Sequence, residues 1–382
     1  MLTPTPFSLF CALLLCLPLA VVFTITTPTT TVSPAAADDK PPSTLRTKLH
    51  SSTPRNPLPK DDHTLLRLAA RVNPNPAHPH QKIAFLFLTT TPLPFAPLWE
   101  LFFNPIDGGR KIRGNKNRFN IYIHADPTRA YDPPFTGVFA GRVIHSKPTN
   151  RHTPTLASAA RRLLAHALLH DPANAVFALL SPSCIPLHSF DFTYQTLTRS
   201  GESFIEILAN ETGARDRWAA RGEDAMLPEV RLEEDFRIGS QFWSLTRSHA
   251  RMVVADRTIW RKFNRTCVRE DTCYPEENYF PTLIHMLDPR GATSATLTHV
   301  DWRGSHGGHP RMYGADEVGP ELINELRNGR PRYGDEEGLM KTNGSDGSVL
   351  SVRRDPFLFA RKFPPEAVGP LMDIAAEAIL KD

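Results

Sequence analysis

The chain has 382 residues, a formal net charge of +4 and 41% hydrophobic residues, enough for one large domain or for two or three average ones. The near balance of 44 basic and 40 acidic residues argues against a dedicated nucleic-acid-binding protein, which concentrates basic residues on one face. The 36 prolines exclude a mainly helical bundle, because proline interrupts helix interiors. Five cysteines are too few for a scaffold built on disulfides.

An uncharged apolar segment, residues 7–25, follows a short tail of residues 1–6. Its 19 residues are long enough to cross the apolar core of a bilayer as a helix. A cleaved signal peptide is the alternative, but the small residues that would suit cleavage, 35–37, lie well beyond the apolar stretch. We expect an uncleaved signal anchor, and both interpretations send the rest of the chain into the secretory pathway.

Residues 26–80 differ in composition from the rest of the chain. They are rich in Thr, Pro, Ser and Ala and contain ten of the 36 prolines, which predicts an extended stem. Within this stem, residues 61–72 have leucines at helical spacing, with acidic residues before them and arginines after them, as the helix dipole favours. We expect a short helix there that packs on a globular domain of residues 81–382.

Strand and helix patterns alternate at the start of this domain. Apolar runs predict strands at residues 81–91, 118–128, 141–146 and 175–187. Helical patterns lie between them, around Trp99 and over residues 155–170. This alternation predicts an α/β fold with a parallel sheet, whose ligand binds at the carboxyl ends of the strands. The polar candidates at those ends are His124, Asp126, Ser181, Ser183 and Cys184.

Two nucleotide-binding motifs are missing from the sequence. It contains neither a Walker phosphate loop nor a G-x-G-x-x-G turn between a strand and a helix. No two aspartates stand two positions apart, so the sequence also lacks a D-x-D motif for a divalent ion. A nucleotide-sugar diphosphate would therefore need Lys or Arg to offset its charge, and Arg361 and Lys362 are among the basic residues near the C-terminus.

The second half of the domain holds an arginine-rich segment. Trp218 lies among Arg215, Arg217 and Arg221, which is a composition that can bind a sugar. The alternative is a solvated arginine surface around one buried indole. Further along, residues 239–247 read as a strand that enters a helix at 248–254.

Two adjacent carboxylates follow a close pair of cysteines. Cys267 and Cys273 can close a small disulfide loop in an oxidising compartment. Glu276 and Glu277 then precede a helical pattern at residues 278–286. Since neighbouring residues do not share a helix face, one carboxylate can point into a cleft as a general base while the other meets solvent or caps the helix. Acidic residues at a helix start are also ordinary structural features.

A glycine-rich loop contains three histidines and an aspartate. His299, Asp301, His306 and His309 could bind a metal ion, as in a metal hydrolase. Their spacing matches no zinc signature, so we interpret these histidines as hydrogen-bonding residues.

Eight segments, taken in order, resemble the core-2/I-branching β-1,6-N-acetylglucosaminyltransferases, most closely the plant branch of that family. The matching segments are residues 82–103, 120–127, 177–187, 203–206, 239–247, 273–282, 298–302 and 358–363. The resemblance implies a GT-A-like fold, a type II anchor in the Golgi membrane and a lumenal catalytic domain. It also implies inverting transfer of a sugar such as N-acetylglucosamine from a UDP-sugar to a glycan hydroxyl, with no divalent metal. A catalytically inactive glycan-binding or scaffolding protein of the same fold is the alternative.

The resemblance also assigns roles to particular residues. Pro275-Glu276-Glu277 matches the P-D-E segment of the family, which places the catalytic base at Glu277. Lys362 lies in the segment that binds the diphosphate, and Arg311 or Lys341 would supply the second basic contact. The segment that contains His124 and Asp126 would lie beside the nucleotide.

The remaining predictions concern the acceptor and the lumenal environment. We expect Trp218, Arg221 and Trp302 to contact the acceptor glycan. The three sequons at Asn210, Asn264 and Asn343 suit a lumenal chain, since such triplets are the acceptors of N-linked glycans. No nucleic-acid partner is expected.

Overall fold

The computed structural model describes residues 57–75, 80–107, 110–111, 113–303, 305, 308–335 and 354–382. These residues belong to one unit, Ser52–Asp382. The predicted tail, anchor and most of the stem lie outside the described residues, as do His306, Lys341 and Asn343. In the part of the chain that the structure describes, no helix combines the length and apolarity needed to span a bilayer.

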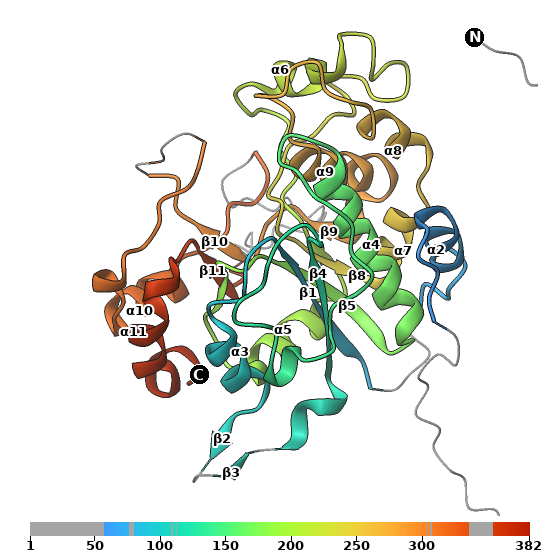
Figure 1. The fold of residues 1–382 in the computed structure, drawn as a ribbon. Coiled ribbons are helices and arrows are strands. Elements are labelled where there is room, and N and C mark those ends of the chain that lie inside the picture. Colours follow the sequence, from blue (N-terminus) through green and yellow to red (C-terminus); the bar gives the residue numbers. More distant parts are fainter. Residues whose placement is uncertain are drawn as a thin grey trace, which may run out of the picture. The chain divides into compact units, whose positions relative to one another are not determined.

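A six-stranded sheet forms the centre of the domain, in the order β4-β1-β5-β8-β7-β9 (Figure 1). β1 pairs in parallel with both β4 and β5, and β7 pairs in parallel with β9, whereas β8 is antiparallel to β5 and β7. The strands are β1 (Lys82–Thr89), β4 (Phe119–Ala125), β5 (Asn174–Leu180), β7 (Ser203–Phe204), β8 (Ser244–Thr246) and β9 (Ala292–Thr293). The predicted α/β class with a mostly parallel sheet is confirmed, and this arrangement fits a GT-A-like fold.

Two smaller sheets complete the strands. In the first, β10 (Thr298–Val300) runs parallel to β11 (Phe359–Arg361), and β11 is antiparallel to β6 (Ile185–Pro186). The second is a hairpin of β2 (Ile106–Asp107) and β3 (Arg110–Lys111). Since β10 and β11 end in the same register, with Val300 opposite Arg361, the residues that follow each strand emerge side by side.

Helices cover both faces of the central sheet (Figure 1). α2, α4 and α7 share one hydrophobic cluster with α8 and α9, whereas α3, α5, α10 and α11 belong to the cluster on the other face. The helices are α2 (Asp62–Ala69), α3 (Ala96–Phe103), α4 (Thr155–His170), α5 (Phe190–Ser200), α6 (Ala214–Trp218), α7 (Arg247–Ala255), α8 (Thr258–Phe263), α9 (Pro275–Leu287), α10 (Pro320–Asn328) and α11 (Val368–Asp373).

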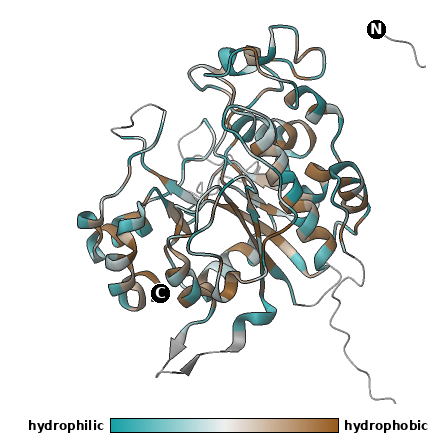
Figure 2. Cartoon of the chain, in the orientation of Figure 1, coloured by the Kyte–Doolittle hydropathy of each residue, from teal (hydrophilic) through white to brown (hydrophobic). Residues whose placement is uncertain are grey.

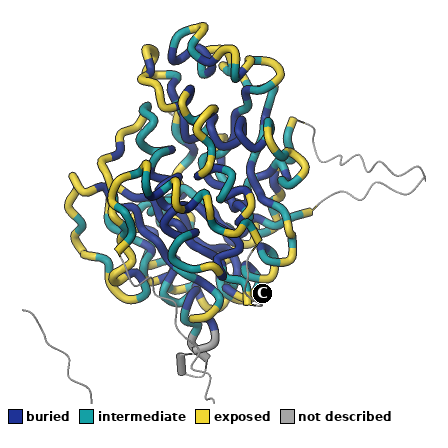
Figure 3. Tube along the Cα trace, turned by 90° about the vertical axis from the view of Figure 1, so that its right-hand side faces the viewer, coloured by how far each residue is buried: buried dark blue, intermediate teal, exposed yellow. Residues whose placement is uncertain are grey.

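The sequence of β1 explains why this sheet is covered on both sides. Side chains of a strand alternate between its two faces. Phe85 and Phe87 belong to the cluster that contains α3, while Ala84 and Leu86 belong to the cluster that contains α4. The central strands are correspondingly hydrophobic in Figure 2 and buried in Figure 3. A continuous apolar run of this kind is typical of a strand that is buried on both faces.

Most predicted elements are confirmed, and the exceptions differ in kind or in extent. Residues 141–146 do not form a strand, and only Val143 bridges to β4. Because Val143 is 45% exposed, pairing at this position buries little apolar surface and gains little stability. The apolar run 175–187 is two strands in two sheets, because β5 ends at Leu180 and β6 starts at Ile185, after the break at Pro182. The predicted helix at 278–286 begins earlier, at Pro275, which suits the first helical position.

Candidate active site

Glu277 lies in the first turn of α9. Its side chain is 30% exposed, and its Oε2 accepts a hydrogen bond of 2.7 Å from Nη1 of Arg217. The Arg217 guanidinium carbon lies 4.7 Å from the centre of the Tyr274 ring. The positive end of a helix dipole stabilises a carboxylate at this position. The structure therefore gives Glu277 both charge stabilisation and access to solvent.

Glu276, its neighbour, has a different environment. It is 6% exposed, and its Oε2 has no hydrogen-bond partner among the described residues. Burial, reinforced by the charge of Glu277, raises the pKa of Glu276 to about 7. The side chains of Glu276 and Glu277 thus point in different directions, as expected for neighbouring residues of a helix. Glu277 is the one that a ligand can reach.

Glu206 adds a third carboxyl group to this region, because Gly239 lies against the backbones of both Glu206 and Glu277. The Gly239 N–H donates a 2.8 Å hydrogen bond to the carbonyl oxygen of Glu277. A Cβ at Gly239 would lie 2.0 Å from the carbonyl oxygen of Glu206, so only glycine fits this close backbone approach. Burial raises the pKa of Glu206 to about 7, against the opposing charge of Arg332, and Glu277 contributes to the increase. Glu206 and Glu277 therefore lie within electrostatic range of each other.

A cluster of basic side chains lies around the end of β11. Arg151 Nη1 and His309 Nε2 are 3.0 Å apart. Burial lowers the pKa of Lys362, and so do the charges of Arg361 and Arg151. Burial also lowers the pKa of His309, assisted by Arg151, Lys362 and Arg361. This mutual repulsion identifies the four residues Arg151, His309, Arg361 and Lys362, called here the basic cluster, as one region of positive potential.

Arg361 connects the basic cluster with Glu277. Its guanidinium carbon lies 4.7 Å from the centre of the Phe242 ring, and its buried Nε has no hydrogen-bond partner among the described residues. Burial lowers the pKa of Arg361, while the charge of Glu277 acts to raise it. A buried charged group without a full set of partners is costly, so Arg361 has unused capacity for an anionic ligand.

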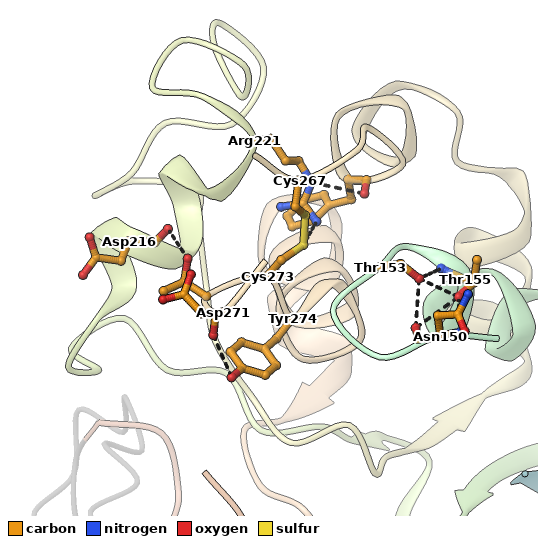
Figure 4. Close-up of a disulfide and its surroundings, with 11 residues drawn as sticks. Asn150, Thr153, Thr155, Asp216, Arg221, Cys267, Asp271, Cys273 and Tyr274 are labelled. Carbon is orange, nitrogen blue, oxygen red and sulfur yellow. Dashed lines mark hydrogen bonds between the residues drawn. A yellow bond between two sulfur atoms is a disulfide. The ribbon is translucent and has the colours of Figure 1, made fainter. Parts of the chain in front are cut away.

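The turn before α4 connects Arg151 with the start of α9. Hydrogen bonds among Asn150, Thr153 and Thr155 close this turn, which Figure 4 shows beside Tyr274. The ring centres of His152 and Tyr274 are 5.2 Å apart. Packing between these rings therefore fixes the position of Arg151 relative to the helix that bears Glu277.

Arg311 and Trp302 lie in the loops beyond β10. The guanidinium of Arg311 pairs with Glu317, and its Nη1 lies 3.9 Å from Oδ2 of the buried Asp301. These two carboxylates already offset the charge of Arg311, which distinguishes it from the basic cluster. Trp302 is 58% exposed, so its ring is accessible to a ligand. Contact of either residue with a substrate stays a prediction.

His124 and Asp126, at the end of β4, are fully buried. The Nε2 of His124 accepts a hydrogen bond of 3.2 Å from the Lys147 N–H, and burial lowers the pKa of His124 to about 4. Asp126 accepts four hydrogen bonds from the N–H and hydroxyl groups of Thr128 and Thr149. Its carboxylate thus holds two loops in place, and contact of His124 or Asp126 with a nucleotide stays a prediction.

We expect Asp126→Asn to destabilise the protein by about 2 kcal/mol near pH 7. Burial raises the pKa of Asp126, but the four hydrogen bonds outweigh it and bring the pKa to about 2, below the ordinary 3.8. A lowered carboxylate pKa contributes stability that is complete above about pH 4 and lost as the pH falls through about 2. Urea unfolding of both proteins at pH 7 and below pH 4 measures this. A difference between them that does not shrink at acidic pH would contradict it.

Trp218 and Arg221 are buried, contrary to the expected glycan-binding rim. They are 7% and 6% exposed. Trp218 Nε1 donates a 2.9 Å hydrogen bond to the carbonyl oxygen of Val230, and Arg221 Nε donates to that of Phe263 at 3.2 Å. Burial lowers the pKa of Arg221 to about 10. These side chains satisfy interior carbonyl groups and leave no face for an acceptor, whereas Arg217 on the same segment reaches Glu277.

Cys267 and Cys273 form a disulfide, with Cα atoms 6.2 Å apart. Figure 4 shows it between Arg221 and Tyr274. Arg221 Nη2 lies 3.7 Å from Cys273 Sγ, and both cysteines pack against Ala220. The disulfide thus closes the loop between α8 and α9, and this loop packs against the segment after α6.

Replacing both cysteines by serine is expected to lower stability by about 2 kcal/mol, the value for a closed loop of this length. Because Tyr274 follows Cys273 directly, we also expect the Arg217–Glu277 pair to loosen. The melting temperature and near-ultraviolet circular dichroism of Cys267→Ser/Cys273→Ser test this against the Cys184→Ser variant, which leaves the disulfide intact. No loss of stability in the double variant would show that the disulfide is dispensable.

The remaining predicted sites are the glycosylation sequons and the candidate metal site. Asn210 and Asn264 are exposed, and glycan attachment at either stays a prediction. Among the described residues, His, Cys, Asp and Glu side chains form no group of three or more that could hold a metal ion.

Comparison with known proteins identifies the family of this chain. Residues 83–327 match the family model of the Core-2/I-Branching enzyme. This chain belongs to that family. It is also 31% identical, over 342 residues, to Glycosyltransferase BC10 of Oryza sativa subsp. japonica, a match that covers 80% of each chain. The Core-2/I-branching match contains Arg151 and Glu277 but ends before Lys362.

Five residues of this candidate site were not among the predicted site residues. Arg217 was considered only as part of a rim, and Arg361 only as one of several C-terminal cations. Arg151 and Glu206 had no assigned role, and His309 was considered only as one of the histidines of the glycine-rich loop. Glu206 carried a signal, because it ends one of the segments that resemble the family. Arg151 carried none, since 158 positions separate it from His309, the residue that it contacts.

Proposed function

We propose that this Core-2/I-branching enzyme transfers a sugar from a UDP-sugar to a glycan hydroxyl with inversion of the anomeric centre and without a divalent metal. The observation that carries the proposal is the position of Glu277. This partly exposed carboxylate at the start of α9 contacts Arg217 and lies within the field of Arg361. One carboxylate beside a region of positive potential is the minimum that such a transfer needs.

In the proposed reaction Glu277 is the general base. The acceptor hydroxyl gives its proton to Oε2 of Glu277 as its oxygen attacks the anomeric carbon. The bond from that carbon to the β-phosphate oxygen breaks on the opposite side, and UDP leaves with the bonding electrons. Arg217 must then yield part of its 2.7 Å contact with Oε2 to the acceptor. A single carboxylate suffices, in contrast to the pair that glycosidases use.

The basic cluster is the proposed binding site of the diphosphate. Negative charge develops on the leaving group, and fixed cations placed there stabilise the transition state. Lys362 is the residue that the family resemblance assigns to this role, and we add Arg361, Arg151 and His309. Anion binding would also relieve the repulsion that lowers the pKa of Lys362. We therefore assign to these side chains the charge neutralisation that a metal ion provides in other enzymes.

The acceptor is proposed to bind on the Arg217 side of Glu277. Arg217 and Glu206 offer a donor and a carboxyl group to sugar hydroxyls, and the exposed ring of Trp302 can stack on a sugar face.

N-acetylglucosamine is our first candidate for the transferred sugar. The enzyme is proposed to be anchored in the Golgi membrane as a type II protein. Its disulfide and its exposed sequons suit an oxidising lumen.

A donor screen with the full-length, detergent-solubilised protein tests this function. UDP-N-acetylglucosamine, UDP-glucuronate and UDP-xylose are each offered with a mixture of glycan acceptors, with and without EDTA. We expect one donor to be consumed, an inverted linkage in the product by NMR, and an unchanged rate in EDTA. Loss of activity in EDTA would contradict the metal-free step, and no turnover of any donor would favour the glycan-binding alternative.

A further inference from the structure

A groove of about 780 Å³ lies between α2 and the pair α7 and α8. These helices pack with α4 in one hydrophobic cluster, whereas the strand β11, which ends at the basic cluster, belongs to the other. In Figure 1 α2 and α7 lie on the right of α4, and β10 and β11 lie on its left. Helix α9 separates the two sites, since its Tyr279 ring contacts Trp260 of the groove while Glu277 lies in its first turn. The groove is therefore distinct from the candidate active site.

Positive charge dominates this groove. Five arginines and a histidine line it, against two carboxylates. Both carboxylates are engaged in internal contacts: Asp62 pairs with Arg162 and Lys147, and Asp256 accepts the Tyr279 hydroxyl and two backbone N–H groups. The field in the groove is consequently set by its cations.

Three of these arginines are available to a ligand. Arg161 donates to backbone carbonyl groups, and Arg261 pairs with a glutamate. Arg67, Arg71 and Arg257 are exposed and form no side-chain hydrogen bond or ion pair with another described residue. A guanidinium presents a planar set of donors that matches a carboxylate. The groove thus presents unused donors for acidic groups.

Apart from Asn264, the rest of the lining is apolar. Trp260 is partly buried in the groove, with the Arg161 guanidinium carbon 4.5 Å from its ring centre, and Leu66, Ala70 and Val254 extend this surface. Aromatic and aliphatic groups suit the C–H face of a pyranose ring, while guanidinium groups suit a carboxylate. A sugar acid combines both features in one unit.

We propose that this groove binds a uronate-bearing segment of a glycan chain, and that it holds the acceptor at a point remote from the reacting hydroxyl. This inference rests on the proposed function, because it takes the acceptor to be a glycan. A concave site accepts a chain of sugar rings, whereas the flat surface of an anionic membrane does not enter it. The groove would then select acidic glycans before transfer begins.

Direct binding tests the inference without any donor sugar. The full-length protein, made with Asn264→Gln so that no glycan occupies the groove edge, is titrated with a fluorescent hexamer of galacturonate. We expect saturable binding that weakens as salt rises and that falls about tenfold or more in Arg71→Ala/Arg257→Ala, since two charge contacts are lost. Arg199→Ala/Arg290→Ala, at two exposed positions outside the groove lining, removes equal charge elsewhere and is the matched control.

The outcomes separate this inference from the proposed function. Glu277→Gln is expected to bind the hexamer as tightly as the protein with an unchanged Glu277. The binding result therefore does not depend on catalysis. Equal binding of a neutral xylose hexamer would overturn the inference, and so would unchanged affinity in the double arginine variant. Binding of phosphatidylserine vesicles through Arg71 and Arg257, without binding of the hexamer, would overturn it in favour of a membrane contact.

Discussion

Glu277→Gln is expected to lower kcat for sugar transfer by about 10²- to 10⁴-fold, the usual contribution of a general base. Glutamine keeps the size of the side chain and its hydrogen bond to Arg217, but its amide cannot take the proton of the acceptor hydroxyl. Binding of the UDP-sugar should change little, because the diphosphate contacts lie in the basic cluster. Initial rates at saturating donor and acceptor, with the melting temperature of each protein, measure the effect.

The neighbouring residue provides a matched control for Glu277. Glu276 stands on the same turn, but it is buried and its pKa is raised to about 7 by burial. Glu276→Gln therefore removes an adjacent carboxyl group that does not face a substrate, and its rate should stay within a few-fold of the wild type. Equal losses of kcat in Glu276→Gln and Glu277→Gln would contradict the role of Glu277. The lower kcat would then result from a disturbed start of α9.

The central part of the fold could be predicted because it follows from local patterns. The apolar run of β1 is continuous, and α4 has a long apolar face, so both were located within a residue or two. The short strands β7, β9 and β10, of two or three residues each, have no pattern of their own. They exist because neighbouring strands supply their hydrogen bonds. The predicted strand at 141–146 fails for the opposite reason, because its position at the surface gives it no second partner.

The site could be predicted only where a residue type and a local context coincide. Glu277 lies beside another carboxylate before a helical pattern, and Lys362 lies in a recognisable segment. Trp218 and Arg221 are residue types that often form a sugar-binding rim. Only the tertiary packing shows that both side chains point inward. Arg151 joins the basic cluster through its contact with His309, and the packing of its neighbour His152 on Tyr274 positions it. Such contacts leave no trace in the local sequence.

Lys362→Ala is expected to lower kcat by about 10²- to 10³-fold, the typical cost of removing one group that stabilises developing negative charge. The lysine is partly buried, and burial together with Arg361 and Arg151 lowers its pKa, so its charge acts where water screens weakly. We expect the effect on kcat to exceed the effect on KM, because the charge on the leaving UDP grows in the transition state. Steady-state kinetics over a range of UDP-sugar concentrations separates the two constants.

Two further variants determine whether this loss is specific to Lys362. Lys362→Arg keeps the charge and should recover part of the activity, since a guanidinium also binds phosphate but from a different position. Arg311→Ala removes a cation already paired with Glu317 and close to Asp301, so its kcat should fall less than tenfold. An equal fall in Arg311→Ala and Lys362→Ala would instead make Arg311 the second diphosphate contact. No fall in Lys362→Ala would remove that residue from the mechanism and leave Arg361 and Arg151 to neutralise the leaving group.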